Sequence, residues 1–223
     1  MSAAIDVDAI LFDLDGTLID SAPDLAGAAD DMRVARGLEA HHLSHYRAMV
    51  GSGARGMLAR AFEIGPDSNS FTGMRDEFLR RYESRMTRHT HVFADVLVLL
   101  HTLDERARRW GIVTNKAERF GLPLVSALPP LATHAVLICG DTTPHAKPHP
   151  EPLLEAARRL GLPPSRCLYV GDDHRDISAG KAAGMATAAA AWGYLGAGEP
   201  VDAWGADHVL TSPKDLLKLL AMA

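Results

Sequence analysis

Short apolar runs alternate with longer stretches of mixed polarity along most of the chain. The first run, at 9–12, stops abruptly at Asp13 and Asp15, as a buried parallel strand does where it meets a functional loop. Similar runs predict further strands at 110–113, 135–139, 167–170, 186–190 and 208–210. Helices are expected between them, near 96–103, 117–128, 150–160, 177–183 and 213–220. This alternation predicts an α/β fold with a doubly wound parallel sheet and helices on both faces.

The pattern differs between residues 22 and 86. This segment predicts several helices, separated by Gly37, by the turn at 51–53 and by the loop at 65–70, and it contains no convincing strand. We therefore predict a Rossmann-like core formed by residues 1–20 and 89–223. Residues 21–88 are predicted to form an all-helical cap inserted after the first strand.

Polar residues gather where the predicted strands end. In an open α/β sheet, ligands bind at the carboxyl edge of the strands, so these residues are the candidate site. They are Asp13 and Asp15 after the first strand, Thr114 and Asn115 after the second, Asp172 and Asp173 after a later one, and Lys147 on a loop that opens a helix.

Composition narrows the classes of function. The chain has 223 residues, 47% of them hydrophobic and 23% charged, which suits an ordinary globular enzyme. Its formal net charge of -5 argues against a nucleic-acid partner. The two cysteines form no disulfide or zinc framework, and no apolar run is long enough for a membrane span, so we expect a cytoplasmic protein. The oligomeric state is not readable from the sequence.

The acidic residues at the sheet edge suggest a magnesium site. Side chains two residues apart on an extended segment point the same way, so Asp13 and Asp15 share one pocket and repel each other. Asp172 offers a further oxygen ligand for a hard cation such as Mg²⁺. Asp173 and Asp176 are expected to hold metal-bound waters or to orient the ligands.

Basic and hydroxyl groups at the same edge suggest a phosphate site. Lys147 supplies a positive charge opposite the acids, and Thr114 offers a hydroxyl beside the backbone N–H groups that open the next helix. A calcium loop ending at Asp24 is an alternative for the first acidic motif, but Leu18 stands where that loop needs glycine. The i, i+4 pair of His41 and His45 is more typical of an exposed helix end than of a zinc site.

Four motifs occur in order: Asp13-Leu14-Asp15-Gly16-Thr17, Val113-Thr114-Asn115, Lys147-Pro148, and Gly171-Asp172-Asp173 with Asp176. Together they resemble the haloacid dehalogenase superfamily, in its phosphatase branch, over nearly the whole chain. The resemblance implies that Asp13 is the nucleophile and that Asp15 is the acid and then the base. It also implies that Thr114, Asn115 and Lys147 bind the phosphoryl group, and that Mg²⁺ is held by the Asp13 carboxylate, the Asp15 carbonyl and Asp172.

The resemblance extends to a class of substrate. The segments 171–177 and 192–194 are typical of the phosphoglycolate phosphatase family, and 51–57 and 115–116 also resemble a branch that acts on N-acetylmuramic acid 6-phosphate. The expected partner is thus a small phosphorylated metabolite, and we expect Arg55 of the cap to meet a substrate carboxylate. A sugar phosphomutase keeps both acids and stays open as an alternative. A phospho-acceptor signalling module fits less well, because it draws its acids from different strands.

Overall fold

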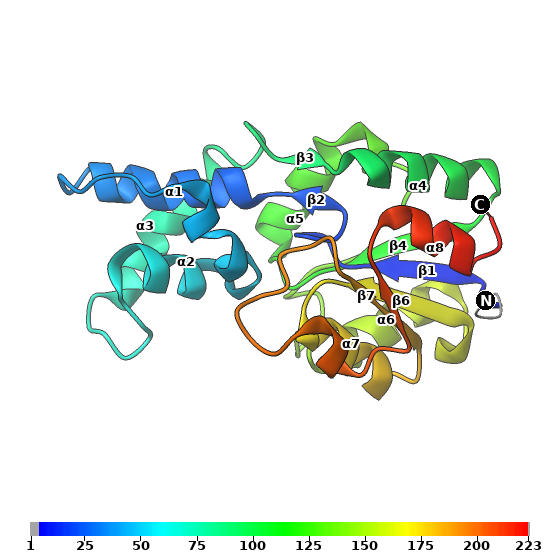
Figure 1. Ribbon diagram of the computed structural model, residues 1–223. Helices are drawn as coiled ribbons and strands as arrows, with labels where there is room; N and C mark the ends of the chain where they lie inside the picture. Colours follow the sequence, from blue (N-terminus) through cyan, green and yellow to red (C-terminus); the bar gives the residue numbers. More distant parts are fainter. Residues whose placement is uncertain (1–4, 223) are drawn as a thin grey trace.

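The structure is a computed structural model that describes residues 5–222 and shows a sheet-containing core with a helical layer at one end (Figure 1). The core sheet has six parallel strands in the order β5-β4-β1-β6-β7-β8. Their bounds are β1 Ala9–Phe12, β4 Arg109–Val113, β5 Leu137–Ile138, β6 Cys167–Gly171, β7 Ala186–Ala190 and β8 His208–Leu210. The strand order reverses direction around β1, which is where an open α/β sheet forms its crevice.

Both faces of β1 are buried, which explains its unbroken apolar sequence. Ile10 and Phe12 belong to one hydrophobic cluster, whereas Ala9 and Leu11 belong to another. Helices α4 (Ala94–Glu105), α5 (Glu118–Ser126) and α8 (Pro213–Leu219) contribute to the first cluster, and α6 (Glu151–Leu160) and α7 (His174–Ala182) to the second. Figure 1 shows α4 and α8 above the sheet and α6 and α7 below it.

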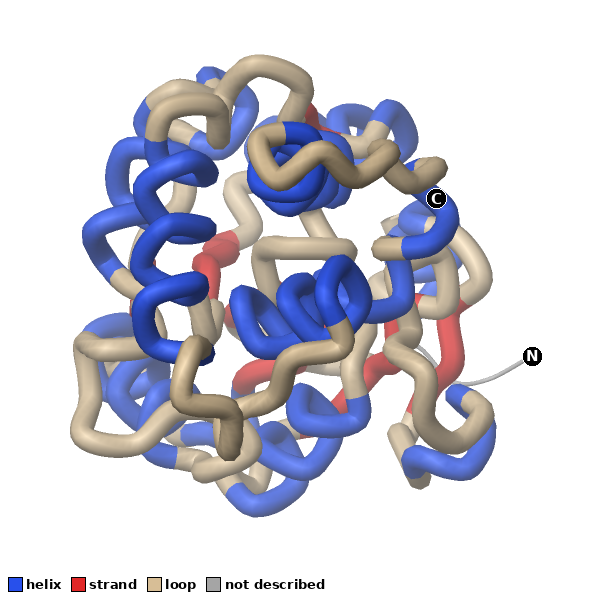
Figure 2. Tube along the Cα trace, turned by 90° about the vertical axis from the view of Figure 1, so that its left-hand side faces the viewer, coloured by secondary structure: helices blue, strands red, loops and turns tan. Residues whose placement is uncertain are grey.

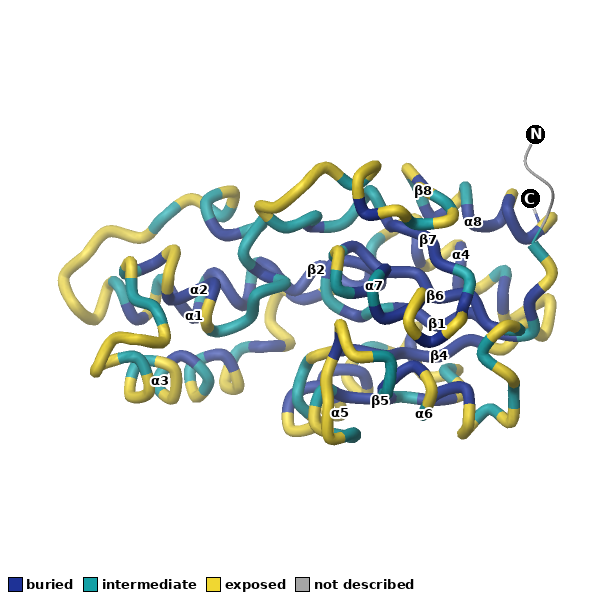
Figure 3. The backbone as a smooth tube through the Cα atoms, turned by 90° about the horizontal axis from the view of Figure 1, so that it is seen from below, coloured by how far each residue is buried: buried dark blue, intermediate teal, exposed yellow. Residues whose placement is uncertain are grey.

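The helical layer is the cap, and it has its own hydrophobic core. Helices α1 (Ala22–Val34), α2 (Gly53–Phe62) and α3 (Phe71–Glu83) pack on one another around Met32, Met57 and Phe78, with the short 3₁₀ turns Leu43–His45 and Arg47–Ser52. The cap helices lie in front of the strands when the molecule is viewed from the cap end (Figure 2). Burial is densest along the central strands, and the outer cap loops are exposed (Figure 3).

Two short strands connect the cap to the core. Strands β2 (Ile19–Asp20) and β3 (His91–Val92) pair antiparallel at the beginning and end of the insertion. The sequence did not indicate them, because two-residue strands have no readable periodicity. They lie at the predicted junctions near residues 20 and 89, whose exact positions stay a prediction.

The predicted α/β fold with a helical cap is confirmed, and the remaining differences are at element ends. Helix α7 begins at His174, before the predicted 177, because Asp173 and Asp176 form a reciprocal capping box at its first turn. Strand β5 is shorter than predicted, since only Leu137 and Ile138 pair with β4. Among the described residues, no helix is long and apolar enough to cross a membrane.

Candidate active site

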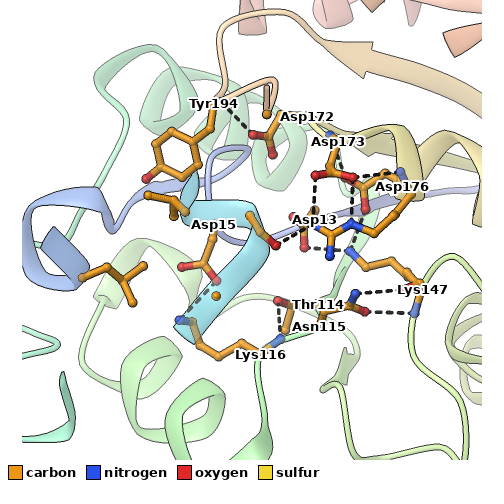
Figure 4. Close-up of a pocket in the computed structure, with 16 residues that line it drawn as sticks. Asp13, Asp15, Thr114, Asn115, Lys116, Lys147, Asp172, Asp173, Asp176 and Tyr194 are labelled. Carbon is orange, nitrogen blue, oxygen red and sulfur yellow. Dashed lines mark hydrogen bonds and ion pairs between the residues drawn. The ribbon is translucent and has the colours of Figure 1, made fainter. Parts of the chain in front are cut away.

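A small pocket lies at the carboxyl edge of the sheet, beneath the cap. It has a volume of about 120 Å³, and all seven residues predicted from the strand ends and the lysine loop line it (Figure 4). The core side is formed by Asp13, Asp15, Thr114, Asn115, Lys147, Asp172, Asp173 and Asp176. The cap contributes Leu25, Val50, Gly51 and Gly53. Residues far apart in the sequence thus meet where three parallel strands end.

Lys147 is the central cation of the pocket. Its Nζ donates to Asp13 Oδ1 at 2.8 Å and to Asp176 Oδ1 at 2.7 Å, and it also contacts the Tyr169 hydroxyl at 2.7 Å. Only 2% of the side chain is exposed. Burial favours the neutral amine, but the facing carboxylates of Asp13 and Asp176 raise the pKa of Lys147 above its ordinary value. The ammonium is therefore charged at neutral pH and is held next to Asp13.

Asn115 fixes the backbone of the lysine loop. Its Nδ2 donates to the Lys147 carbonyl and its Oδ1 accepts from the Lys147 N–H, both at 2.9 Å. These two bonds use one N–H and one lone pair of the carboxamide, so the Asn115 side chain positions Lys147 in this structure. That Asn115 also binds phosphate stays a prediction. Thr114 is buried, and its Oγ1 accepts from the N–H of Lys116, which leaves the hydroxyl proton to donate into the pocket.

Three carboxylates form a group with the chemistry of a magnesium site. Ligand oxygens of Asp13, Asp172 and Asp176 lie within 4.8 Å of one another. Burial raises the pKa of Asp13 to about 7 although Lys147 opposes the shift, and burial together with the charges of Asp13 and Asp176 raises the pKa of Asp172 well above its usual range. Buried acids of this kind need a cation to stay ionised, and an all-oxygen set suits a hard ion. The residues present therefore fit Mg²⁺.

Asp172 is held in place by the first loop and by the segment after β7. Its Oδ1 accepts from the Thr17 hydroxyl and its Oδ2 from the Tyr194 N–H, each at 2.8 Å. The backbone comes so close at Gly16 that a Cβ would lie 2.2 Å from Asp172 Oδ2, and Gly16 has a φ of +89°. Only glycine fits that position of the first motif.

Asp173 and Asp176 lie in the pocket, and both are engaged by protein groups. The Asp173 carboxylate pairs with Arg175, with 2.8 Å between Nε and Oδ1, and the same guanidinium donates to the Gly51 carbonyl of the cap. Asp176 accepts from Lys147 and from the Asp173 N–H. Asp173 therefore joins core to cap through Arg175, and Asp176 orients Lys147. The expectation that the two hold metal-bound waters stays a prediction.

Asp15 is held by two neighbours that the sequence did not single out for the site. Its Oδ1 accepts a short hydrogen bond from the Ser21 hydroxyl, and its Oδ2 lies 3.2 Å from Lys116 Nζ. Tyr194 donates to Asp20 at 2.9 Å and accepts from the N–H groups of Ser21 and Ala22. The sequence signals for Lys116 were a cation placed directly after Thr114 and Asn115, and the resemblance that residues 115–116 carry.

Arg55 lies beside the first pocket rather than in it. It borders a second cavity of about 500 Å³, which shares Asp173, Arg175 and Gly196 with the first pocket. Glu199 and Trp204 also border this cavity. The predicted contact of Arg55 with a substrate carboxylate therefore requires a substrate that extends beyond the smaller pocket.

Histidine groups elsewhere have local explanations. The rings of His41 and His45 lie 4.2 Å apart, but both residues are half-buried and His41 precedes the 3₁₀ turn Leu43–His45, so the expectation of an exposed helix end is wrong. His145, His149 and Glu151 form an exposed group of possible ligands, yet His145 bonds Glu151 at 2.8 Å and His149 Nδ1 accepts the Glu151 N–H at 3.2 Å. These bonds stabilise the start of α6 without a metal.

Asp24, the last residue of the calcium-loop alternative, accepts hydrogen bonds from the backbone N–H groups of His89 and Thr90 and does not face the acidic motif.

Comparisons with known proteins agree with this geometry. The family model for haloacid dehalogenase-like hydrolases matches residues 10–190. The chain is 45% identical over 209 residues to a phosphoglycolate phosphatase of Xanthomonas campestris, with 93% of this chain and 94% of that protein covered. It is 40% identical over 215 residues to an N-acetylmuramic acid 6-phosphate phosphatase of Pseudomonas putida, covering 96% of each.

A solved structure shows the same likeness at the level of the fold. The crystal structure of a predicted phosphoglycolate phosphatase from Haemophilus somnus superposes with a TM-score of 0.83 at 27% identity. The match covers 96% of this chain and 97% of that one, so it includes both the sheet and the cap.

Proposed function

The chain belongs to the haloacid dehalogenase-like hydrolase family, and we propose that it is a magnesium-dependent phosphatase that hydrolyses a small phosphorylated metabolite through an aspartyl-phosphate. The observation that carries the proposal is the contact between Asp13 and the buried ammonium of Lys147, at 2.8 Å, inside a group of carboxylates. A carboxylate, a hard-cation site and a fixed positive charge at one point are what phosphoryl transfer to aspartate needs.

The first half of the reaction transfers the phosphoryl group to Asp13. A carboxylate oxygen of Asp13 forms a bond to phosphorus while the ester P–O bond breaks, and Asp15 gives a proton to the leaving oxygen. Lys147 and the Thr114 hydroxyl bind the phosphoryl oxygens. When bound by Asp13, the Asp15 carbonyl and Asp172, Mg²⁺ neutralises charge on the phosphoryl group and on the acids.

The second half returns Asp13 to its starting state. Asp15, now a carboxylate, takes a proton from a water molecule whose oxygen bonds to phosphorus as the Asp13–phosphorus bond breaks. Inorganic phosphate and free Asp13 result, and Asp15 again carries the proton that the next cycle uses. Leu25 and Val50 of the cap line the pocket and give it an apolar wall opposite the acids.

The relatives name two substrates, and the cavities bear on the choice between them. A pocket of about 120 Å³ suits a phosphoryl group with a very small organic part such as glycolate. The adjoining cavity of about 500 Å³, bordered by Arg55 and Glu199, has the size that larger metabolites occupy. It favours an acidic sugar phosphate such as N-acetylmuramic acid 6-phosphate as the second candidate.

A panel of phosphate esters tests the proposal. Phosphate release from phosphoglycolate, N-acetylmuramic acid 6-phosphate and glucose 6-phosphate is measured with and without Mg²⁺, beside the Asp13→Asn protein. We expect Mg²⁺-dependent release from at least one ester and a loss of several orders of magnitude in the variant. Turnover by Asp13→Asn at the wild-type rate would exclude the mechanism. An isomerised hexose phosphate without free phosphate would identify a phosphomutase instead.

A cytoplasmic location is part of the proposal, and the free state of Cys139 and Cys167 agrees with it.

A further inference from the structure

The pocket contains a second buried ammonium that the mechanism above does not use. Lys116 follows Asn115 on the loop after β4, and only 8% of its side chain is exposed. Its Nζ lies 3.2 Å from Asp15 Oδ2. Figure 4 shows the two side chains pointing toward each other. Lys147 has its own partners in Asp13 and Asp176, so the two lysines serve different carboxylates. Lys116 is thus the cation that faces Asp15, the residue that transfers protons in the proposed mechanism.

Lys116 also contacts the cap. Its Nζ donates to the Tyr82 hydroxyl at 3.0 Å and lies 4.8 Å from the centre of the Tyr82 ring. Tyr82 belongs to α3, is almost fully buried, and stacks at 6.4 Å on Phe78 of the cap core. Its ring also lies 5.6 Å from the ring of Phe120 in the core helix α5, so the position of the Tyr82 hydroxyl is set by how the cap packs against the core. A single ammonium joins the cap helix to the acid of the core.

The two oxygens of Asp15 are held from two directions. Ser21, on the segment that leads into the cap, donates to Oδ1, and Lys116 lies against Oδ2. A carboxylate oxygen has more than one lone pair, so both oxygens can still exchange a proton with substrate or water. The two contacts thus restrict where the carboxylate points without blocking it.

We propose that Lys116 is a positioning residue that holds the Asp15 carboxylate in line for proton transfer, and that its contact with Tyr82 makes this alignment depend on the place of the cap. The inference rests on the proposed phosphatase function. Proton transfer falls off steeply with misplacement, and an error of about 1 Å can cost about 100-fold in rate. The structure thus supplies a direct link from cap position to chemistry.

Steady-state kinetics with the best ester of the panel test this link. Lys116→Met is expected to lower kcat about 100-fold while KM changes by less than about threefold, because the substrate phosphoryl group is bound by other residues. Tyr82→Phe removes only the hydroxyl and is expected to lower kcat about fivefold, the effect of one lost hydrogen bond. The double variant should be no slower than Lys116→Met, because Tyr82 acts through Lys116.

Tyr46→Phe is the matched control. Its hydroxyl is also in the cap, where it donates to Asp30 at 2.7 Å, and it has no contact with Asp15 or Lys116 in the described part of the chain. This variant is expected to keep the wild-type kcat. Melting temperatures of all variants show whether a loss of kcat is only a loss of folded protein.

The outcomes separate this inference from the function on which it rests. If the wild-type protein releases no phosphate from any ester, the phosphatase proposal fails. If the wild-type protein is active and folded Lys116→Met retains its kcat, the positioning role is wrong. A raised KM with unchanged kcat would place Lys116 in substrate binding, and equal losses in Tyr82→Phe and Tyr46→Phe would remove the link to the cap.

Discussion

Replacing Asp13 by asparagine should stabilise the magnesium-free protein while it abolishes catalysis. Asparagine has the shape of aspartate but never carries its charge, and its Oδ1 can still accept from Lys147. Burial raises the pKa of Asp13 from 3.8 to about 7, so the folded protein disfavours the ionised carboxylate. The substitution removes that electrostatic cost, and its size can be worked out from the pKa.

The sign follows from proton binding. Between pH 4 and pH 7 the folded protein holds a proton on Asp13 that the unfolded chain has lost, so the free energy of unfolding falls as pH rises through this window. A difference of about 3 in pKa corresponds to a cost on the order of 4 kcal/mol above pH 7. At about pH 5 the cost is on the order of 2 kcal/mol, and below the unfolded pKa it vanishes.

Thermal unfolding in EDTA measures the effect. At roughly 2 °C per kcal/mol for a chain of this size, Asp13→Asn is expected to melt about 8 °C above the wild-type protein at pH 8 and about 4 °C above it at pH 5. Saturating Mg²⁺ should raise the wild-type melting temperature more than that of the variant, since the ion offsets the charge that the variant lacks. A variant less stable than wild type at pH 8 in EDTA would refute the assignment of Asp13 as a strained buried acid.

Three further substitutions test the larger cavity and the attachment of the cap. Gly198 borders the larger cavity, and a Cβ there would meet no atom within 4 Å, so Gly198→Phe should lower kcat/KM for sugar phosphates about tenfold relative to phosphoglycolate. Gly65→Phe, at an equally open position of the cap, is the control. If both variants show the same ratio of kcat/KM values, the larger cavity does not bind the sugar. Arg55→Ala should lower kcat/KM about tenfold for esters whose carboxylate reaches the larger cavity, such as N-acetylmuramic acid 6-phosphate, and an unchanged value for such an ester would end that expectation. Asp24→Ala removes a buried carboxylate that accepts from the Thr90 N–H at 2.8 Å. The free energy of unfolding, measured in urea, should fall by about 3 kcal/mol. A loss below about 1 kcal/mol would show that the contact is dispensable.

The fold and the content of the pocket could be predicted because both follow from local patterns. Apolar runs of strand length alternate with helical stretches, and every parallel strand delivers its carboxyl end to the same edge of the sheet. The residues that follow β1, β4 and β6, among them Asp13, Thr114 and Asp172, therefore had to meet there. Strands β2 and β3 were not predicted, because two residues are too few to show the alternation of apolar and polar positions that marks a strand.

The sequence by itself determined which chemical groups gather at the sheet edge, since that depends only on the order of strands and loops. Tertiary structure alone decided which of those groups contact one another. It placed Lys147 against Asp13 and Lys116 against Asp15, turned Asn115 toward the lysine loop, and brought Tyr82 of the cap into contact with Lys116. Such contacts join residues tens of positions apart. They depend on how separate loops of the core meet and, for Tyr82, on how the cap packs against the core, which no local pattern of residues encodes.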